Sequence, residues 1–303
     1  MRLAKIISEY RTVYSNWFSV LYQMYRIRNK VKDKTNAMIK IRLRGKNDAL
    51  NAPYHVVDSY VAAMTTSNPK IHNASIDNRL LFFSYDNYNL KFDLGNSDAF
   101  RGVFCDEEYN FLKVKGKDVL DIGANVGDTP IYFALKGAKK VIALEPYPYN
   151  FNLAQKNLQT FLTNYPEFKD KIEIINAGYG EDKIIKIDTS FIPDGCSDLR
   201  ENENGPDINL YSLKTLVNKY NIVSGILKMD CEGCEYSLLN EDDEIIKKFF
   251  MIEIEYHYGY EKLVDKLRKC GYNIRYTEPH KFYNSSIGKM TIVGFIYAQQ
   301  PVK

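Results

Sequence analysis

The sequence predicts an α/β protein whose mostly parallel sheet is covered by helices on both faces, with an α+β extension at the N-terminus. Strand-like apolar runs alternate with helix-like segments from Phe104 onward, an alternation typical of parallel sheets. The clearest unit is Val119–Asp128, where an apolar strand leads through a glycine turn into a helix. A second apolar run, Lys140–Leu144, follows at the spacing of a crossover connection. We therefore expect a nucleoside-like ligand at the carboxyl ends of these two strands.

The first 100 residues are predicted to form a cap region. Leu3–Ile27 carries aromatic and apolar residues at helical spacing, which predicts one amphipathic helix. Ala37–Leu43 alternates apolar and polar residues and is followed by a Gly-Lys-Asn turn, as expected of a strand. A second helix is expected over 51–67 and a hairpin over 80–92. We interpret residues 1–100 as a basic helix with a small β cap, and not as an independently stable domain.

Residues 101–303 are predicted to form the main domain. Its helices are expected at 129–135, 150–162, 213–220 and 261–270. Its strands are expected at 119–121, 140–144, 172–175, 225–230, 249–256, 273–276 and 291–298, with an edge strand at 183–189. The last two strands of the sheet are expected to form an antiparallel pair. The stretch 192–206 is polar and contains Gly and Pro, which predicts a loop near the binding site.

The glycine turn is the first candidate binding element. Gly123 and Gly127 lack Cβ atoms, so the backbone can turn tightly and a ligand can lie against it. Asp128 or Thr129 can cap the next helix, and Pro130 suits its first turn. Free N–H groups at that helix start would face an anionic group of the ligand. The cofactor-binding residues predicted from this turn are Gly123, Ala124, Asn125, Gly127 and Asp128.

Two acids decide which cofactor fits this turn. Glu145 ends the second strand and can accept hydrogen bonds from both hydroxyls of a ribose. The GxGxxG spacing of dinucleotide sites is absent, because position 125 is an asparagine. Asp121, directly before the turn, suits a pyrophosphate poorly but suits the positively charged methionine end of S-adenosylmethionine (SAM). We therefore predict that the chain binds SAM, with Asp121 and Glu145 among the cofactor-binding residues.

Several segments together resemble the FkbM family of SAM-dependent methyltransferases. They are Val119–Asp128 with Ala143–Pro146, then Asn176–Gly180, Leu227–Tyr236 and Ile252–His257. The Leu227–Tyr236 segment is similar to the family's K-x-D-x-E-G-x-E signature. Tyr179 stands where the family has a small residue, and Cys231 and Cys234 stand where it has other residues, but no charged group is lost. The resemblance covers about residues 103–298.

This resemblance implies a fold and an activity. The fold is that of a class I methyltransferase, with a Rossmann-like, mostly parallel sheet of seven strands. The activity is SAM-dependent methylation of an acceptor hydroxyl, often on a sugar or a natural product. The matching segments also add Pro146, Asn176 and Ala177 to the expected cofactor-binding residues.

The candidates for the chemistry follow the fourth and fifth predicted strands. Asp230 is assigned to the amino group of the cofactor or to the floor of the cleft. Glu232 is the first candidate for the base that takes the acceptor's proton, His257 is the second, and Glu255 has a positioning role. Lys228 is expected to pack or pair beside the cofactor site. Structural alternatives stay open: the two acids Asp230 and Glu232 can cap the following helix, and His257 can be a partly buried ring within an aromatic run.

Tyrosines surround the second of these candidates. The run Tyr256-His257-Tyr258-Gly259-Tyr260 combines flat apolar faces with hydroxyl groups, which suits a sugar acceptor. The alternative is an aromatic rim that packs the last helix.

Composition limits the other classes of function. The five cysteines are scattered, which predicts a reducing cytoplasm. Cys231 and Cys234 form a CxxC, but no second pair accompanies it and the family signature overlies it, so a metal or redox role is not expected. The four histidines make no spacing typical of zinc sites, and we predict no metal. The sequence has no bilayer-spanning apolar stretch, and no signal-peptide pattern opens it.

Charge divides the chain into a basic arm and an acidic body. Residues 1–46 hold twelve Lys or Arg and two acids, a net charge of +10. Because the whole chain carries +3, the remainder carries −7. The arm can pack its apolar face on the body with its charges solvated, contact an anionic membrane through Trp17 and Phe18, or contact RNA phosphates. RNA is the weakest alternative, because no RNA-binding motif accompanies the arm.

The sequence thus predicts a cytoplasmic SAM-dependent methyltransferase that acts on a hydroxyl of a glycan, a small molecule or a lipid-linked acceptor. Two rivals remain. An RNA methyltransferase would use the basic arm and would bind RNA in a strongly salt-dependent way. A SAM-binding module without catalysis would keep its role after loss of Asp230 and Glu232.

Overall fold

The computed structural model describes residues 2–30, 37–193, 197–284 and 289–301. Residues 31–36 of the basic arm, and residues 194–196 of the predicted polar loop with one of the five cysteines, lie outside these described residues. The chain divides into two compact units, of which the first comprises Met1–Glu108 with Lys156–Thr163 and the second comprises Tyr109–Gln155 with Asn164–Lys303.

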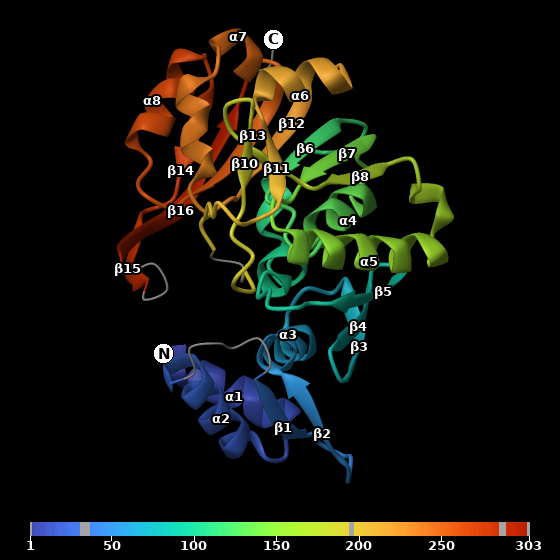
Figure 1. Ribbon diagram of the computed structural model, residues 1–303. Helices are drawn as coiled ribbons and strands as arrows, with labels where there is room; N and C mark the ends of the chain where they lie inside the picture. The colour runs from blue at the N-terminus through green and yellow to red at the C-terminus, as the bar shows by residue number, and fades with distance from the viewer. Residues whose placement is uncertain (1, 31–36, 194–196, 285–288, 302–303) are drawn as a thin grey trace. The chain divides into compact units, whose positions relative to one another are not determined.

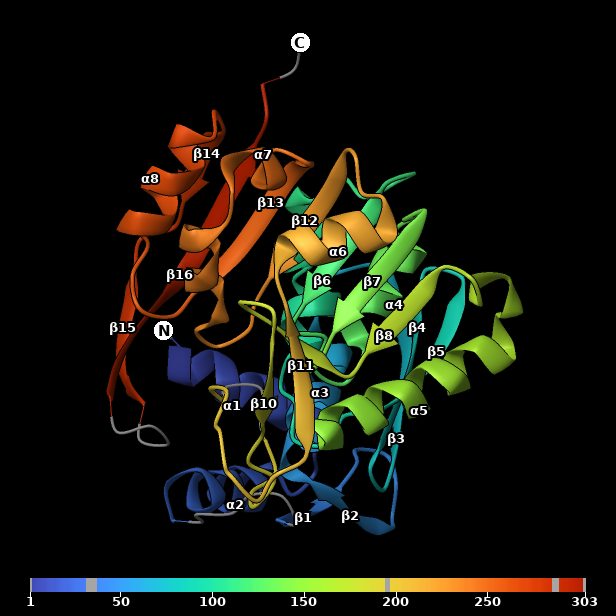
Figure 2. The ribbon, with the colours of Figure 1, turned by 45° about the horizontal axis from the view of Figure 1, so that its top comes forward.

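The second unit is built on one large sheet, which confirms the predicted class I methyltransferase fold. The described residues form eight strands of this sheet, so the predicted number of seven is wrong. Its strands lie in the order β14-β16-β13-β12-β6-β7-β8, and β15 adds to β16 outside this path. The strands are β6 (Asp118–Ile122), β7 (Lys140–Leu144), β8 (Ile172–Ile175), β12 (Gly225–Met229), β13 (Phe249–Tyr256), β14 (Asn273–Tyr276), β15 (His280–Asn284) and β16 (Lys289–Gln299). The five strands from β13 to β8 are parallel, and β16 is antiparallel to β13 and β14. Figures 1 and 2 show this order across the sheet.

Helices cover both faces of the sheet because its strands are apolar on both sides. Alternate residues such as Leu120 and Ile122 of β6 share one core with residues of three C-terminal helices, while Val119 is buried on the opposite face. The helices that contribute to that core are α6 (Leu213–Tyr220), α7 (Asp243–Ile246) and α8 (Glu261–Lys269). Helix α4 (Asp128–Leu135) packs against β6, β7 and β8, and α5 (Pro148–Asn164) follows β7 in the chain.

A small second sheet stands beside the large one. It has the order β10-β11-β9, formed by β10 (Lys183–Lys186), β11 (Asp207–Tyr211) and β9 (Ala177–Tyr179). Apolar residues of β10 and β11 pack with Tyr147 into a separate cluster, whereas Ala177 and Tyr179 of β9 belong to the main core. Two 3₁₀-helices, η3 (Pro166–Phe168) and η4 (Cys234–Asn240), complete this unit, and η4 directly follows the loop after β12. This arrangement places the small sheet next to the carboxyl ends of the large sheet's strands.

In the described part of the first unit there are three α-helices and two small antiparallel sheets. The helices are α1 (Arg2–Val13), α2 (Trp17–Lys30) and α3 (Tyr54–Thr65). The strands are β1 (Met38–Arg42) with β2 (Ala49–Pro53), and β3 (Ile71–Asp77) with β4 (Leu80–Tyr85) and β5 (Tyr88–Asp93). A short π-helix, η1 (Arg101–Cys105), and the 3₁₀-helix η2 (Glu108–Phe111) follow.

The single helix predicted over residues 3–27 is wrong, because the chain turns between α1 and α2. Tyr14 is fully buried there and donates a hydrogen bond from its hydroxyl to the carbonyl of Val57. The Asn16 side chain accepts from Arg42 N and donates to Lys40 O. These bonds attach the turn to β1 and to the helix that contains Val57, so tertiary contacts override a helical periodicity that runs unbroken through the sequence.

Helix α2 is apolar on two sides. It buries Val20 and Met24, yet Phe18, Tyr22 and Tyr25 lie 72%, 58% and 62% exposed at helical spacing. Membrane contact was predicted through Trp17 and Phe18; Phe18 is exposed, whereas Trp17 is half-buried. Among the described residues, no helix has the length and apolarity that crossing a bilayer requires.

Candidate active site

A pocket opens at the carboxyl edge of the sheet, where β6, β7 and β12 end. It is lined from β6 and its turn, from the end of β7, from the small sheet and from the loop after β12. Among the predicted residues, those that line it are Gly123, Asn125, Glu145, Pro146, Ala177, Asp230 and Glu232. The others, Asp121, Ala124, Gly127, Asp128, Asn176 and His257, do not. The carboxyl ends of parallel strands therefore bring together side chains that are more than 100 residues apart in the chain.

The glycine turn forms one wall. Gly123 has a φ of 91°, and a Cβ on it would lie 1.8 Å from the backbone oxygen of Asp230. Gly123 and Ala124 both donate their N–H groups to the carbonyl of Leu144, which fixes the turn to β7. Gly127, with a φ of 84°, is the N-cap of α4 without any side-chain cap. The predicted capping by Asp128 or Thr129 is wrong, because Thr129 donates its hydroxyl to Asp121 instead.

Replacing Gly123 by Ala should abolish SAM binding and lower the free energy of unfolding. The added methyl overlaps the Asp230 carbonyl, so the turn and the loop after β12 must separate, at a cost of about 1–3 kcal/mol beyond the backbone strain. Gly116→Ala is the matched control, since Gly116 also has a positive φ of 71° but open space around its Cβ position. Urea unfolding and SAM calorimetry of both variants test this. Equal losses in the two variants would contradict it.

Glu145 closes the opposite side of the pocket. Its carboxylate accepts hydrogen bonds from the N–H groups of Asn125 (2.9 Å) and Tyr147 (3.0 Å). Burial raises the pKa of Glu145 to about 8, and these two backbone donors oppose the rise. Each carboxylate oxygen has a second lone pair for another donor. The position, at the end of β7 on the pocket wall, fits the predicted contact with the ribose hydroxyls of SAM.

Asp121 lies beneath the turn and does not face the pocket. It is fully buried, and Lys228 Nζ pairs with it at 3.1 Å. Burial raises the pKa of the Asp121 carboxyl, whereas Lys228 lowers it. Lys228 also donates to the carbonyl of Gly123 at 2.7 Å. The predicted direct contact of Asp121 with the methionine end of SAM is therefore not supported by its place; instead Asp121 and Lys228 lock the glycine turn to β12.

Asp128 is the second buried acid near the turn. In the part of the chain that the structure describes, neither carboxylate oxygen has a partner in normal hydrogen-bond geometry. Burial raises the pKa of Asp128 to about 7, and the charge of Lys228 opposes that rise. The carboxyl group sits at the first residue of α4, where the free N–H groups of a helix partly compensate a negative charge.

The remaining cofactor residues stand beside Glu145. Asn176 donates its side-chain amide to the carbonyls of Glu145 (2.9 Å) and Pro146 (3.0 Å). It thus shapes the wall on which Glu145 stands, while Pro146 and Ala177 contribute apolar surface to the pocket. An adenosine-like group with ribose hydroxyls fits a wall that combines a carboxylate with apolar surface, so these residues fit SAM.

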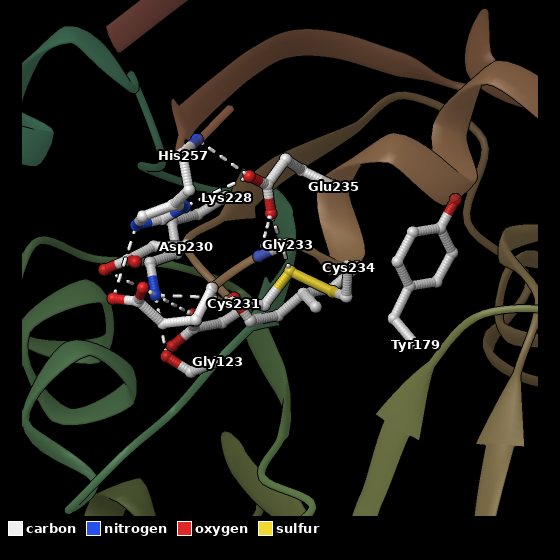
Figure 3. The surroundings of a disulfide bond; sticks show 12 residues. Gly123, Tyr179, Lys228, Asp230, Cys231, Gly233, Cys234, Glu235 and His257 are labelled. Atoms are coloured by element: carbon white, nitrogen blue, oxygen red, sulfur yellow. Dashed lines mark hydrogen bonds and ion pairs between the residues drawn. A yellow bond between two sulfur atoms is a disulfide. The ribbon is translucent and has the colours of Figure 1, made fainter. Parts of the chain in front are cut away.

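The loop after β12 carries the candidate base. Glu232 lines the pocket, and its carboxylate lies 3.3 Å from Nε2 of His257. Nδ1 of His257 lies 3.0 Å from the carboxylate of Glu235, which also accepts the backbone N–H of His257. Figure 3 shows His257 above this loop, with Glu235 bonded to it. The imidazole is therefore held between two carboxylates, one facing the pocket and one fully buried.

These contacts settle the structural alternatives. The cap of η4 is Gly233, without a side-chain hydrogen bond, so neither acid caps it. Asp230 accepts from the Tyr109 hydroxyl at 3.1 Å and forms part of the pocket wall. His257 is buried but ion-paired, and not simply packed in an aromatic run. Of the neighbouring tyrosines, Tyr256 is buried and Tyr260 stacks on Tyr276, so Tyr258 alone lines a cavity.

The ionisation states of His257 and Glu232 follow from their burial and from neighbouring charges. Burial by itself would lower the pKa of His257, but the hydrogen bonds and charges of Glu232 and Glu235 outweigh burial and raise it well above its usual value. Burial raises the pKa of Glu232 to about 7, although His257 works against this rise. We conclude that His257 carries the proton at neutral pH and that Glu232 titrates in the physiological range.

Among the described residues, Asp230, Glu255 and His257 form the one group whose atoms are close enough to share a metal ion. Both ring nitrogens of His257 face carboxylates, however, and a ring that is protonated at both nitrogens cannot ligate. The donor set therefore supplies an ion pair, and the predicted absence of a metal site remains a prediction.

The cysteines give one result that the sequence analysis did not predict. Cys231 and Cys234 form a disulfide, and both line the pocket. The sequence analysis did not predict this bond, and the expectation that the CxxC has no metal or redox role stays a prediction. Of the other described cysteines, Cys105 and Cys270 are free and buried.

Other residues of the site were not predicted from the sequence, because only packing brings them to the pocket. Glu235 is the most important; its place in the K-x-D-x-E-G-x-E segment was a signal that could have found it. Tyr147, Asn150, Gly178, Tyr179, Ser197 and Leu199 also line the pocket. The last two belong to the polar loop that was predicted near the site.

Comparison with known proteins agrees with this geometry. The chain matches the FkbM methyltransferase domain over residues 121–274, about half of its length. Over 105 residues it is 35% identical to a protein of Methanocaldococcus jannaschii named "Putative protein N5-glutamine methyltransferase", covering 30% of this chain and 53% of that protein. The chain thus spans about half the length of this curated relative. It is 33% identical over 164 residues to "Uncharacterized protein 158B" of Sulfolobus islandicus rod-shaped virus 1, covering 53% and 73% of the two chains.

Among solved structures, the chain is similar to the FkbM methyltransferase of Methylobacillus flagellatus, with 18% identity and a TM-score of 0.37. The similarity covers 60% of this chain and 43% of that one.

The strand order, the glycine turn after β6 and the acid after β7 are those of the class I methyltransferase fold. The chain belongs to the FkbM methyltransferase domain family.

Proposed function

We propose that the protein transfers the methyl group of SAM to a hydroxyl of a sugar or another polyhydroxylated acceptor that is neutral or cationic. Glu232 is the base in this proposal, and His257 and Glu235 position it. The observation that carries the proposal is an acidic groove that continues the cofactor pocket and has Glu232 at the junction.

The groove and the pocket are continuous because they share lining residues. Tyr179, Leu199, Glu232 and Cys234 belong to both. An acceptor in the groove would therefore meet the cofactor beside Glu232. Tyr258 adds an aromatic ring to the groove, and its hydroxyl donates to Asp198 at 2.8 Å. A flat ring beside carboxylates is a surface on which a sugar can stack and donate hydrogen bonds.

The charge of the groove selects among acceptors. Its lining contains one basic residue, Lys183, against six acids, which are Glu181, Asp182, Asp198, Glu201, Glu232 and Glu241. Carboxylates accept hydrogen bonds from hydroxyl and ammonium groups, but they repel phosphates. RNA binding depends on neutralising phosphates with Lys and Arg. The groove therefore favours hydroxylated acceptors over the RNA alternative, although the arm at residues 1–46 is basic.

His257 and Glu235 hold the carboxylate of Glu232 in place. Glu235 is fully buried and fixes the imidazole of His257 through Nδ1. The other nitrogen of His257 then faces Glu232, whose carboxylate is 15% exposed and reaches the groove. Only Glu232 contacts an acceptor, so His257 and Glu235 are positioning residues. A base with a pKa of about 7 accepts a proton efficiently near neutral pH.

SAM supplies an electrophilic methyl group on a sulfonium. The acceptor oxygen forms the new C–O bond as the S–C bond breaks, its electron pair returns to sulfur, and the hydroxyl proton goes to Glu232. Alignment of acceptor and cofactor by the continuous pocket and groove accounts for the largest part of the acceleration in such a transfer.

A panel of acceptors with radiolabelled SAM tests this function. We expect methyl uptake by neutral and amino-bearing sugars. Their phosphorylated counterparts should take up methyl groups at least about tenfold less, which corresponds to ~1.4 kcal/mol. Glu181→Gln with Asp182→Asn should reduce that discrimination. A glutamine-containing peptide and an RNA hairpin serve as competing acceptors. Preference for either would refute the proposed acceptor, and tight SAM binding without any transfer would favour the non-catalytic alternative.

A further inference from the structure

We propose that the Cys231–Cys234 disulfide is a redox-sensitive switch that, when closed, holds Glu232 against His257. This inference rests on the proposed function, since it assigns regulation to the same site. Reduction by a dithiol would release Glu232 and slow methyl transfer. The S–S bond accepts two electrons and two protons to give two cysteine thiols, and the dithiol becomes a cyclic disulfide.

The first observation is the position of the bond. It closes a loop of four residues whose two inner members are Glu232 and Gly233. The loop starts directly after Asp230 and ends where η4 begins at Cys234. Figure 3 shows the two sulfur atoms beside Gly233. No other link of this length in the described chain encloses a candidate for the base.

The second observation is the backbone of the enclosed residues. Glu232 has a φ of 54° and Gly233 a φ of 114°, so both lie in the left-handed region. That region is unfavourable for a residue with a side chain, and such a residue persists in it when its surroundings leave no alternative. A four-residue ring is a strong constraint of this kind. Opening the ring lets Glu232 relax to ordinary backbone angles, which turns its side chain away from His257.

The third observation is a buried acceptor that responds to the redox state. Glu235 Oε2 accepts the N–H of Gly233 at 2.8 Å and lies 3.6 Å from Sγ of Cys231. In the disulfide, that sulfur has no hydrogen to donate. After reduction the Cys231 thiol becomes a second donor to the same oxygen. The hydrogen bonding of Glu235, which fixes the middle of the loop, therefore differs between the two redox states.

The bond is also accessible to a reductant. Cys231 and Cys234 are half-buried and line the pocket, and Cys234 lines the groove as well. A small dithiol can enter from either side, whereas bound SAM covers the pocket side. By linkage, a state of the loop that binds SAM better is also stabilised by SAM, so the cofactor and the disulfide should affect each other.

NMR titration of the His257 ring in oxidised and dithiothreitol-reduced protein tests the positional part without any acceptor. The chain has four histidines, so His257→Gln assigns the signal. We expect reduction to lower the imidazole pKa, because Glu232 no longer contributes to it. The oxidised Glu232→Gln variant should show a similar fall in the imidazole pKa, and reduction should then change that pKa little. An identical titration in both redox states would overturn the proposal.

The rate of methyl transfer tests the effect of reduction on catalysis. With an acceptor from the panel, full reduction should lower kcat at least about tenfold, and Cys231→Ser with Cys234→Ser should lower it equally and abolish the response to dithiothreitol. The control lacks the other three cysteines, through Cys105→Ala, Cys196→Ala and Cys270→Ala, and should keep the response. Unchanged kcat in fully reduced enzyme would overturn the switch. Absence of transfer in both states would refute the proposed function instead, while the NMR result still decides the loop.

Discussion

Replacing Glu232 by Gln should lower kcat by roughly 10²–10⁴-fold, the range that a positioned general base contributes. The variant keeps the shape of the side chain and a hydrogen-bonding atom toward His257, but it cannot take the acceptor's proton. SAM affinity should change less than about threefold, because Glu232 stands at the junction with the groove. Steady-state kinetics and SAM calorimetry measure the two effects. Glu244→Gln, at a side chain 83% exposed, is the matched control.

The pH dependence of kcat/KM tests whether Glu232 is the base. The base acts in its ionised form, so kcat/KM should rise tenfold per unit below pH 7 and level off above it, since the pKa of Glu232 is raised to about 7. His257→Gln removes the cation that opposes this rise, and the midpoint should therefore move to higher pH. A midpoint unaffected by His257→Gln, or a Glu232→Gln enzyme with normal kcat, would exclude Glu232 as the base.

Replacing Glu145 by Ala should weaken SAM binding by roughly 10- to 150-fold. Hydrogen bonds to a charged group are worth about 1.5–3 kcal/mol, and the variant also leaves the N–H groups of Asn125 and Tyr147 without their acceptor. Calorimetry with SAM, and with NAD as a control ligand, measures the loss. Glu167→Ala, at an exposed acid, should bind SAM as the wild type does. A Glu145→Ala protein that is folded and binds SAM normally would contradict the placement of the ribose.

Glu145 also predicts a dependence of binding on pH. Its pKa of about 8 means that the empty pocket holds a protonated carboxyl at pH 7, whereas ribose hydroxyls donate best to a carboxylate. SAM binding should therefore release a proton and tighten as pH rises from 6.5 toward 8.5. The same shift makes folding stability fall over this range, because the unfolded chain, with its lower pKa, binds fewer protons there than the folded chain. Calorimetry in buffers of different ionisation enthalpy counts the proton.

The local patterns of the sequence were sufficient for the large sheet. Strands such as Lys140–Leu144 and Phe249–Tyr256 are mainly apolar, and parallel strands buried on both faces need that pattern. Helix α8 ends where Gly271 follows, as the periodicity indicated. The same patterns were misleading at residues 14–16, because the hydrogen bonds that break the helix come from β1 and α3, whose positions local periodicity does not contain.

Some residues of the candidate site were likewise predicted from the sequence and others were not. Gly123, Glu145, Asp230 and Glu232 were predicted because each follows the carboxyl end of a strand, and parallel strands align those ends. The partner of Asp121 was not predicted, because Lys228 reaches it from a strand that is adjacent in the sheet but 107 residues away in the chain. A carboxylate before a glycine turn suits a ligand cation or a lysine equally well.

The sequence by itself therefore determined the sheet, the cofactor-binding edge and the family, since these depend on periodicity and on motifs within about ten residues. Only the tertiary structure decided the state of the chemical groups. The carboxylates that flank His257 and the acidic lining of the groove join segments that are distant in the chain. The disulfide beside Glu232 joins cysteines only three positions apart, but the CxxC pattern by itself did not decide its bonding. Charge, burial and redox state are properties of such neighbourhoods, because electrostatic interactions depend on distance in space and on exclusion of water.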